Sequence, residues 1–180
     1  MDVNDIQNLK YPIGTFSIPN SISRTDIEAW TKILEDIPKQ LIEITKPLNE
    51  SELNYNYRPE GWTIKQVIHH LADSHMNSLI RFKLTLTEYS PTIKPYDEAK
   101  WAKLVDYEYD IETALAILNG VHTKLGHLLQ HLSNEDFKRQ YLHPEHNKHF
   151  SIEETIGLYA WHSEHHLAHI KQALHYKGQF

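Results

Sequence analysis

The chain has 180 residues, 40% hydrophobic and 23% charged, with 24 acidic against 18 basic side chains and a formal net charge of −6. This length fits one domain with a substantial core, so we expect residues 1–180 to form a single unit, with 1–21 as an N-terminal extension packed on it. An acidic chain without a stretch rich in Lys and Arg argues against binding to nucleic acid.

No apolar run approaches the roughly 18 residues that a membrane helix requires, so we expect no contact with a membrane. The first residues carry two Asp and have no apolar core, which argues against a secretory signal or a transit peptide. We therefore expect a cytoplasmic protein. Cysteine is absent, whereas histidine is abundant, with 14 residues. Any transition-metal site must therefore use histidine and carboxylate ligands.

Two long helices are predicted in the first half of the chain. The first begins at Ser23, which can cap the helix and is followed by apolar residues at steps of three and four up to Ile44. The second begins with a capping box at Thr63 and continues to about Tyr89. Residues 90–110 contain two prolines and no sustained period, which predicts a long crossover with a short helix around Trp101.

Two further long helices are predicted in the second half. The first, over residues 111–132, has the tightest apolar repeat in the chain. Residues 133–150 are polar and predict a second crossover, and a helix then runs from the cap at Ser151 to about Tyr176. We find no convincing alternating strand. The sequence thus predicts an all-α fold, a four-helix bundle with long crossover loops.

The last helix contains a cluster of histidines, in the run Trp161 to His169. The pairs His162/His166 and His165/His169 are each four residues apart, so either could bind one metal ion from adjacent turns. At about 100° per residue, His166 lies on the inward face of the helix and His162 at its edge, whereas His165 points away and His169 lies off this face. The inward pair is the better ligand pair, because metal sites in bundles use side chains that point into the core.

The second helix offers a third ligand, in the run from His69 to His75. His70 flanks the apolar stripe and His75 lies within it, so helical periodicity leaves both open as the third ligand. His69 points opposite the stripe and is expected in solvent. We likewise expect His122 on the third helix to be exposed, and His165 to be either a surface residue or a hydrogen-bond donor to a metal ligand.

Several segments resemble the DinB-like superfamily, specifically its YfiT-type branch of metal-dependent hydrolases and bacillithiol transferases. The longest is GWTIKQVIHHLADSHMNS, followed closely by Arg81-Phe-Lys. The segments that carry the resemblance are residues 61–78 with 81–83, 11–14, 93–98, 137–139, 143–144 and 158–163. They span nearly the whole chain.

This resemblance implies a four-helix bundle in which His70, His162 and His166 hold one divalent metal ion, most simply zinc or nickel. It also implies a homodimer. Open coordination positions distinguish such a catalytic site from a closed structural one. The metal could acidify water for hydrolysis, or bind a low-molecular-weight thiol such as bacillithiol for S-transfer to a small-molecule electrophile. The alternative is a stress-related metal-binding or interaction module without catalysis.

Four further residues are candidates for the surroundings of the metal or for the substrate pocket. Asp73 could accept a hydrogen bond from the free ring N–H of a neighbouring histidine. His169 could donate a hydrogen bond to a residue that surrounds the metal ion. Asn77 and Arg81 could line the pocket. We see no obvious carboxylate that could act as general base beside the ligands, which favours a nucleophile generated at the metal.

Overall fold

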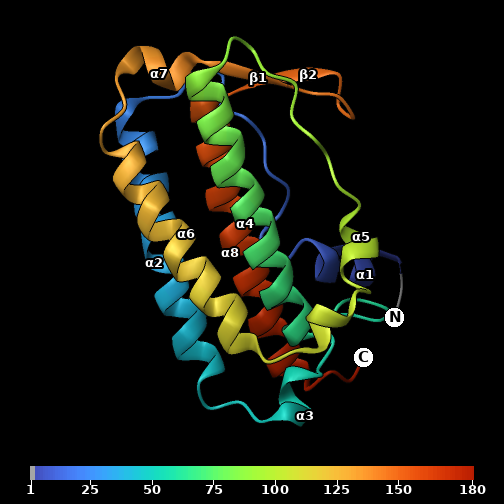
Figure 1. The fold of residues 1–180 in the computed structure, drawn as a ribbon. Coiled ribbons are helices and arrows are strands. Elements are labelled where there is room, and N and C mark those ends of the chain that lie inside the picture. Colours follow the sequence, from blue (N-terminus) through green and yellow to red (C-terminus); the bar gives the residue numbers. More distant parts are fainter. Residues whose placement is uncertain (1–2) are drawn as a thin grey trace.

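The computed structural model describes residues 3–180 and contains four long helices (Figure 1). They are α2 (Arg24–Thr45), α4 (Ile64–Thr87), α6 (Ile111–Leu129) and α8 (Ile152–Tyr176). The predicted all-α four-helix bundle is confirmed, and the predicted helix starts agree with the structure to within one residue. Of the helices described, none is long and apolar enough to cross a membrane.

Local capping fixes where three of these helices begin. Ser23, Thr63 and Ser151 each accept a hydrogen bond from the backbone N–H three residues on, and the side chain of that residue binds back to the cap. Such a reciprocal pair satisfies two backbone donors that the first turn leaves free. The helix α6 lacks a side-chain cap, so its start depends more on the packing of its apolar face.

The long helices form a ring in which α2 packs on α6 and α8, and α4 also packs on α6 and α8. Figure 1 shows that α4 and α6 run in the same direction, although they are consecutive long helices. The chain therefore has to return along the whole bundle between them, which explains the long crossover over residues 88–110. This crossover contains α5 (Glu98–Trp101) and a 3₁₀ turn over Val105–Glu108.

The connection from α6 to α8 differs from the sequence prediction. It contains α7 (Asn134–Lys138) and an antiparallel hairpin of β1 (Gln140–His143) and β2 (Lys148–Ser151). We expected no strand here. The strands have only four residues each and are mostly polar, so the alternation that reveals longer strands is missing. Residues outside the ring also form α1 (Val3–Lys10) and α3 (Glu50–Leu53).

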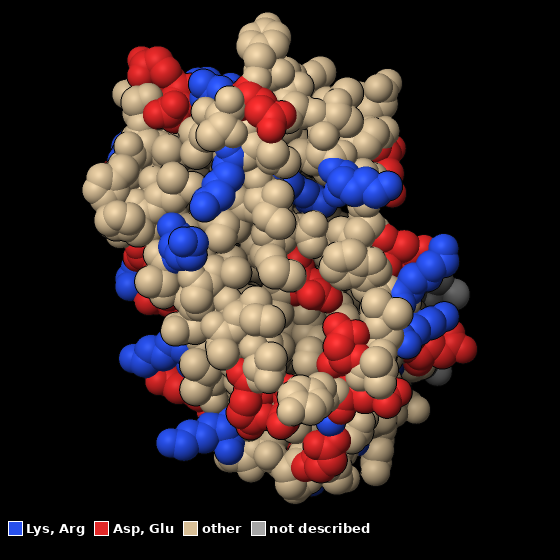
Figure 2. All heavy atoms as spheres, viewed as in Figure 1, with Lys and Arg blue, Asp and Glu red and all other residues tan. Residues whose placement is uncertain are grey.

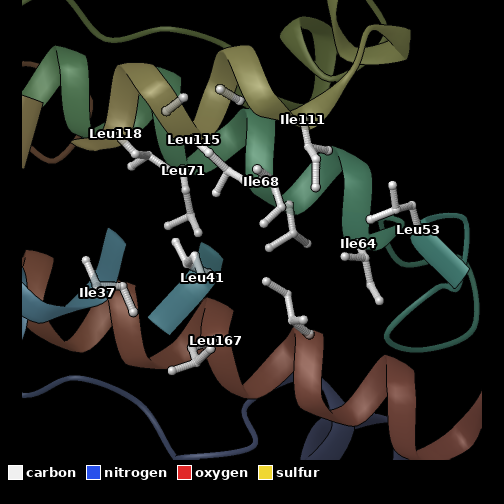
Figure 3. Packing of buried hydrophobic residues seen from close by; sticks show 14 of the residues in the cluster. Ile37, Leu41, Leu53, Ile64, Ile68, Leu71, Ile111, Leu115, Leu118 and Leu167 are labelled. Atoms are coloured by element: carbon white, nitrogen blue, oxygen red, sulfur yellow. The ribbon is translucent and has the colours of Figure 1, made fainter. Parts of the chain in front are cut away.

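The buried apolar residues form two clusters at different levels of the bundle. The lower cluster, shown in Figure 3, joins side chains from all four long helices, such as Leu41, Leu71, Leu118 and Leu167. The other is built around Phe82 and residues near the opposite ends of the same helices. Between the two clusters, several buried residues of α4, α6 and α8 are polar: His70, Ser74, His75, Ser78, His122, Ser163 and His166. The core is thus divided by a polar layer.

On the face shown in Figure 2, no extended basic area is seen, and acidic side chains gather in its central and lower part. The face opposite is not seen in this view. Among the exposed large apolar residues, Met76 and Ile80 lie one turn apart on α4, and an apolar area of this size is normal for a protein surface.

We expect replacement of Leu71 by Ala to destabilise the protein strongly. Its side chain is fully buried in the lower cluster, and removing a buried Leu side chain costs about 2–5 kcal/mol. Urea denaturation of the two proteins measures the difference. The matched control is Ile80→Ala on the same helix, which is 51% exposed and should change the free energy of unfolding by less than about 0.5 kcal/mol. Equal losses in the two variants would contradict this description of the core.

Candidate metal centre

Three histidines from two helices converge in the polar layer. His70 comes from α4, and His162 and His166 lie one turn apart on α8. One ring nitrogen of each lies within 4.8 Å of the others, and Nε2 of His70 is 3.2 Å from Nε2 of His162. Two nitrogens bound to one tetrahedral ion at about 2.0–2.1 Å would be about 3.3 Å apart. The spacing of this pair therefore fits a shared metal ion.

Burial keeps all three rings neutral. It lowers the pKa of His70 to about 4 and holds the pKa values of His162 and His166 well below their usual value. The neighbouring histidines add to this effect for His162 and His166, because a second positive charge nearby is unfavourable. A neutral imidazole has a free lone pair, which is the form that binds a metal ion.

The orientation of His166 is fixed by His169, which in turn contacts the N-terminal segment outside the bundle. Nε2 of His169 is 3.1 Å from the backbone carbonyl of Lys10, which can only accept, so this nitrogen donates. Nδ1 of His169 is then an acceptor and lies 3.4 Å from Nδ1 of His166. His166 therefore carries its proton on Nδ1, which leaves Nε2 with the lone pair.

His162 has a similar neighbour on its other side. Its Nδ1 lies 3.3 Å from Nε2 of His75, while its Nε2 faces His70. His75 therefore lies behind His162. Periodicity left open whether His70 or His75 joins His162 and His166, and in the structure it is His70 that joins them. The ring of His75 in turn stacks on His122, with 4.8 Å between ring centroids.

The remaining candidates lie in different places. Asp73 accepts a hydrogen bond of 2.7 Å from the hydroxyl of Tyr107, and its backbone carbonyl accepts one from Asn77. Neither side chain has a hydrogen bond to the three clustered histidines. Arg81, by contrast, lines the cavity that opens beside them. His169 lies directly behind His166, as described above.

Three histidines expected in solvent are buried: His69, His122 and His165. Nε2 of His69 binds the carbonyl of Tyr109 in the crossover, at 3.2 Å. Nδ1 of His122 binds the carbonyl of Leu34 on α2, and His165 packs between Trp161 and residues of the N-terminal extension. For His69 and His165 the expectation was wrong because it considered only the bundle axis, whereas segments outside the four long helices contact these outward faces. His122 lies inside the bundle, where its ring contacts His75 of α4 and the carbonyl of Leu34 of α2.

A cavity of about 550 Å³ opens on the histidine cluster. His70 and His162 form part of its wall, and aromatic residues from three segments form much of the rest: Tyr96, Tyr141, Phe150 and Tyr159. Sequence reasoning did not identify Tyr96 or Tyr141 as site residues. Tyr96 lies in the motif 93–98 that carried the family resemblance, and this was the one available signal.

The fold and the cluster define a class: four-helix bundles with a three-histidine centre beside an open cavity. The family model described as the DinB superfamily matches residues 33–170. The chain therefore belongs to the DinB superfamily, as its motifs predicted.

Individual relatives agree with this assignment. A protein of Oceanobacillus iheyensis is 48% identical over 163 residues, covering 91% of this chain and 94% of its own. YfiT of Bacillus subtilis is 45% identical over 166 residues, covering 92% and 93%, and both are named "Putative metal-dependent hydrolase". The solved structure of YfiT, described as a probable metal-dependent hydrolase with an unusual four-helix bundle topology, matches with a TM-score of 0.92 at 44% identity, over 95% of this chain and 98% of that one.

We expect His169→Ala to weaken metal binding without removing a ligand of the cluster. The change takes away the acceptor that fixes the proton of His166, and such partners typically contribute about 10–100-fold to metal affinity. Competition with a chromophoric chelator measures the dissociation constant. His175→Ala, an exposed position on the same helix, is the matched control and should bind as the unchanged protein does. Unchanged affinity in His169→Ala would contradict the proposed orientation.

We also expect the metal-free protein to lose stability in mild acid. Burial lowers the pKa of His122 to about 4 from 6.5, so its contribution is complete above pH 6.5 and is lost as the pH falls towards 4. The loss approaches about 1.4 kcal/mol per pH unit for one such group. Urea denaturation from pH 7 to pH 4 should give a shallower dependence for His122→Phe, whereas the exposed control His131→Ala should retain the original slope.

Proposed function

We propose that this protein is an enzyme that uses one divalent transition metal ion, held by His70, His162 and His166, to act on a small molecule in the adjoining cavity. The observation that supports this most directly is the meeting of three neutral imidazoles at one point, with two Nε2 atoms 3.2 Å apart. Imidazole ligands suit zinc and nickel, which are our candidates for the ion.

The charge of the three histidine ligands determines how strongly a bound ion would activate a nucleophile. Three neutral ligands leave a divalent ion its full charge, so an ion bound there would lower the pKa of a coordinated water or thiol. Among the residues described, no carboxylate hydrogen-bonds to the three histidines. The protein therefore offers no acidic general base at the cluster, which favours a nucleophile activated by the ion itself.

Two reactions are compatible with such a site. In hydrolysis, water adds to an ester or amide carbon, and the leaving group departs with a proton. In thiol transfer, a low-molecular-weight thiol such as bacillithiol loses its proton, its sulfur forms a bond to an electrophilic carbon, and the leaving group departs with its bonding electrons. The names of the relatives favour the hydrolase. A cytoplasmic location and a homodimer stay predictions from the sequence.

The metal site is tested by His166→Ala. We expect the purified protein to contain about one transition metal ion per chain, and this variant to lose most of it, because two imidazoles bind far more weakly than three. Elemental analysis after dialysis provides the measurement. His175→Ala should retain its metal. If His166→Ala kept the same metal content, the site assignment would be wrong.

The reaction is tested with metal-loaded protein and a panel of esters, amides, haloalkyl amides and epoxides, each with and without bacillithiol. Product formed without added thiol identifies a hydrolase. Conjugate formed at the expense of the thiol identifies a transferase. No turnover of the panel by the metal-loaded protein would favour a non-catalytic metal-binding or interaction module.

A further inference from the structure

One cationic side chain lies inside the cavity and has no anionic partner. Arg81 projects from α4 and lines the same cavity as His70 and His162. Its Nη1 donates a hydrogen bond of 3.3 Å to the hydroxyl of Tyr159, and that hydroxyl donates one of 3.3 Å to the carbonyl of Ser74. Ser74 is one helical turn from His70, and Tyr159 is nearly one turn from His162. This bridge therefore holds the guanidinium close to the histidine cluster.

The guanidinium has unused hydrogen-bond donors. Its bond to Tyr159 is the one protein hydrogen bond of this group in the described part of the chain. Its Nε is buried without a partner, and no described carboxylate forms an ion pair with it. Leaving a buried N–H of a guanidinium without an acceptor is costly, and the parallel N–H groups of this side chain match the two oxygens of a carboxylate or phosphate.

The acidic residues of the cavity lie at its mouth. Asp97, Glu98 and Glu145 line it but belong to residues exposed to solvent, where water and salt screen charges. Partial burial raises the pKa of the Glu98 carboxyl group, which disfavours its charged form. Asp97 is further engaged, since it caps the backbone of Lys100 and pairs with its Nζ at 2.9 Å. The interior therefore offers a positive charge beside the histidines, behind a weakly negative mouth.

We propose that Arg81 binds a carboxylate or phosphate group of the substrate, and so selects small anionic molecules whose reactive group lies at the histidine cluster. Tyr159 is the positioning residue, since its hydroxyl directs the guanidinium. This inference rests on the proposed metal-dependent function, because it places the reacting part of the substrate at the three histidines.

The test uses pairs of hydroxamates, which bind divalent ions and presume neither hydrolysis nor thiol transfer. One member of each pair has an alkyl tail, and the other has a tail of the same length, two to four methylenes, that ends in a carboxylate or a phosphonate. Calorimetry on the zinc-loaded protein gives their affinities. We expect at least one anionic member to bind about tenfold more tightly than its neutral partner, as charge-assisted hydrogen bonds allow.

The variants assign this preference to Arg81. Arg81→Gln should abolish the preference for the anionic hydroxamate and leave the affinity of the neutral hydroxamates unchanged. Tyr159→Phe should reduce this preference in part. Lys83→Gln removes the same charge from an exposed position on the same helix and should retain it. Metal content and thermal unfolding of each variant show that the fold and the cluster are intact.

The outcomes separate the two proposals. Equal binding of neutral and anionic members at every length, or a preference that survives in Arg81→Gln, would overturn the anion site and leave the metal site standing. The affinity of the neutral hydroxamates measures whether a metal ion is bound at the histidine cluster. If no hydroxamate bound to protein that had been incubated with zinc, the proposed function would fail, and this inference with it.

Discussion

The burial of several imidazoles between two apolar clusters is the constraint on which the rest of this structure depends. A buried polar ring must have its N–H and its lone pair satisfied, or the fold loses free energy. Backbone carbonyls bind one nitrogen of each of two rings, that of Lys10 for His169 and that of Leu34 for His122. The three rings at the cluster instead turn nitrogens towards one another. A shared cation is the simplest way to satisfy three lone pairs at once.

The segments outside the four long helices are part of this arrangement. The N-terminal extension supplies the carbonyl of Lys10, and its Leu9 carbonyl accepts a hydrogen bond from Gln172 on α8. The crossover over residues 88–110 exists because α4 and α6 run in the same direction (Figure 1). Once it returns along the bundle, it brings Tyr96 to the cavity and covers His69. The crossover that the topology requires thus also encloses the site.

The four long helices and the pair His162 and His166 could be predicted because both follow from the 3.6-residue period and from capping residues at fixed offsets. Helical periodicity could not choose the third histidine, since His70 and His75 both lie near the inward face of α4, and the sequence selected His70 through the family resemblance alone. The burial of His69 and His165 was missed for a related reason. Helical facing identifies the side turned to the bundle axis, whereas these rings are covered by segments distant in the sequence.

The histidine cluster and the cavity wall are built from different parts of the fold. The three clustered histidines lie on long helices anchored at both ends by apolar packing, so their geometry is rigid. Tyr96 and Tyr141 come from connections, which tolerate change more readily than a packed helix. Arg81 lies between these cases, because it belongs to α4 but is held by a single hydroxyl. Substitutions at the cavity can therefore change the substrate while the metal centre stays intact, and relatives that share the cluster need not share a substrate.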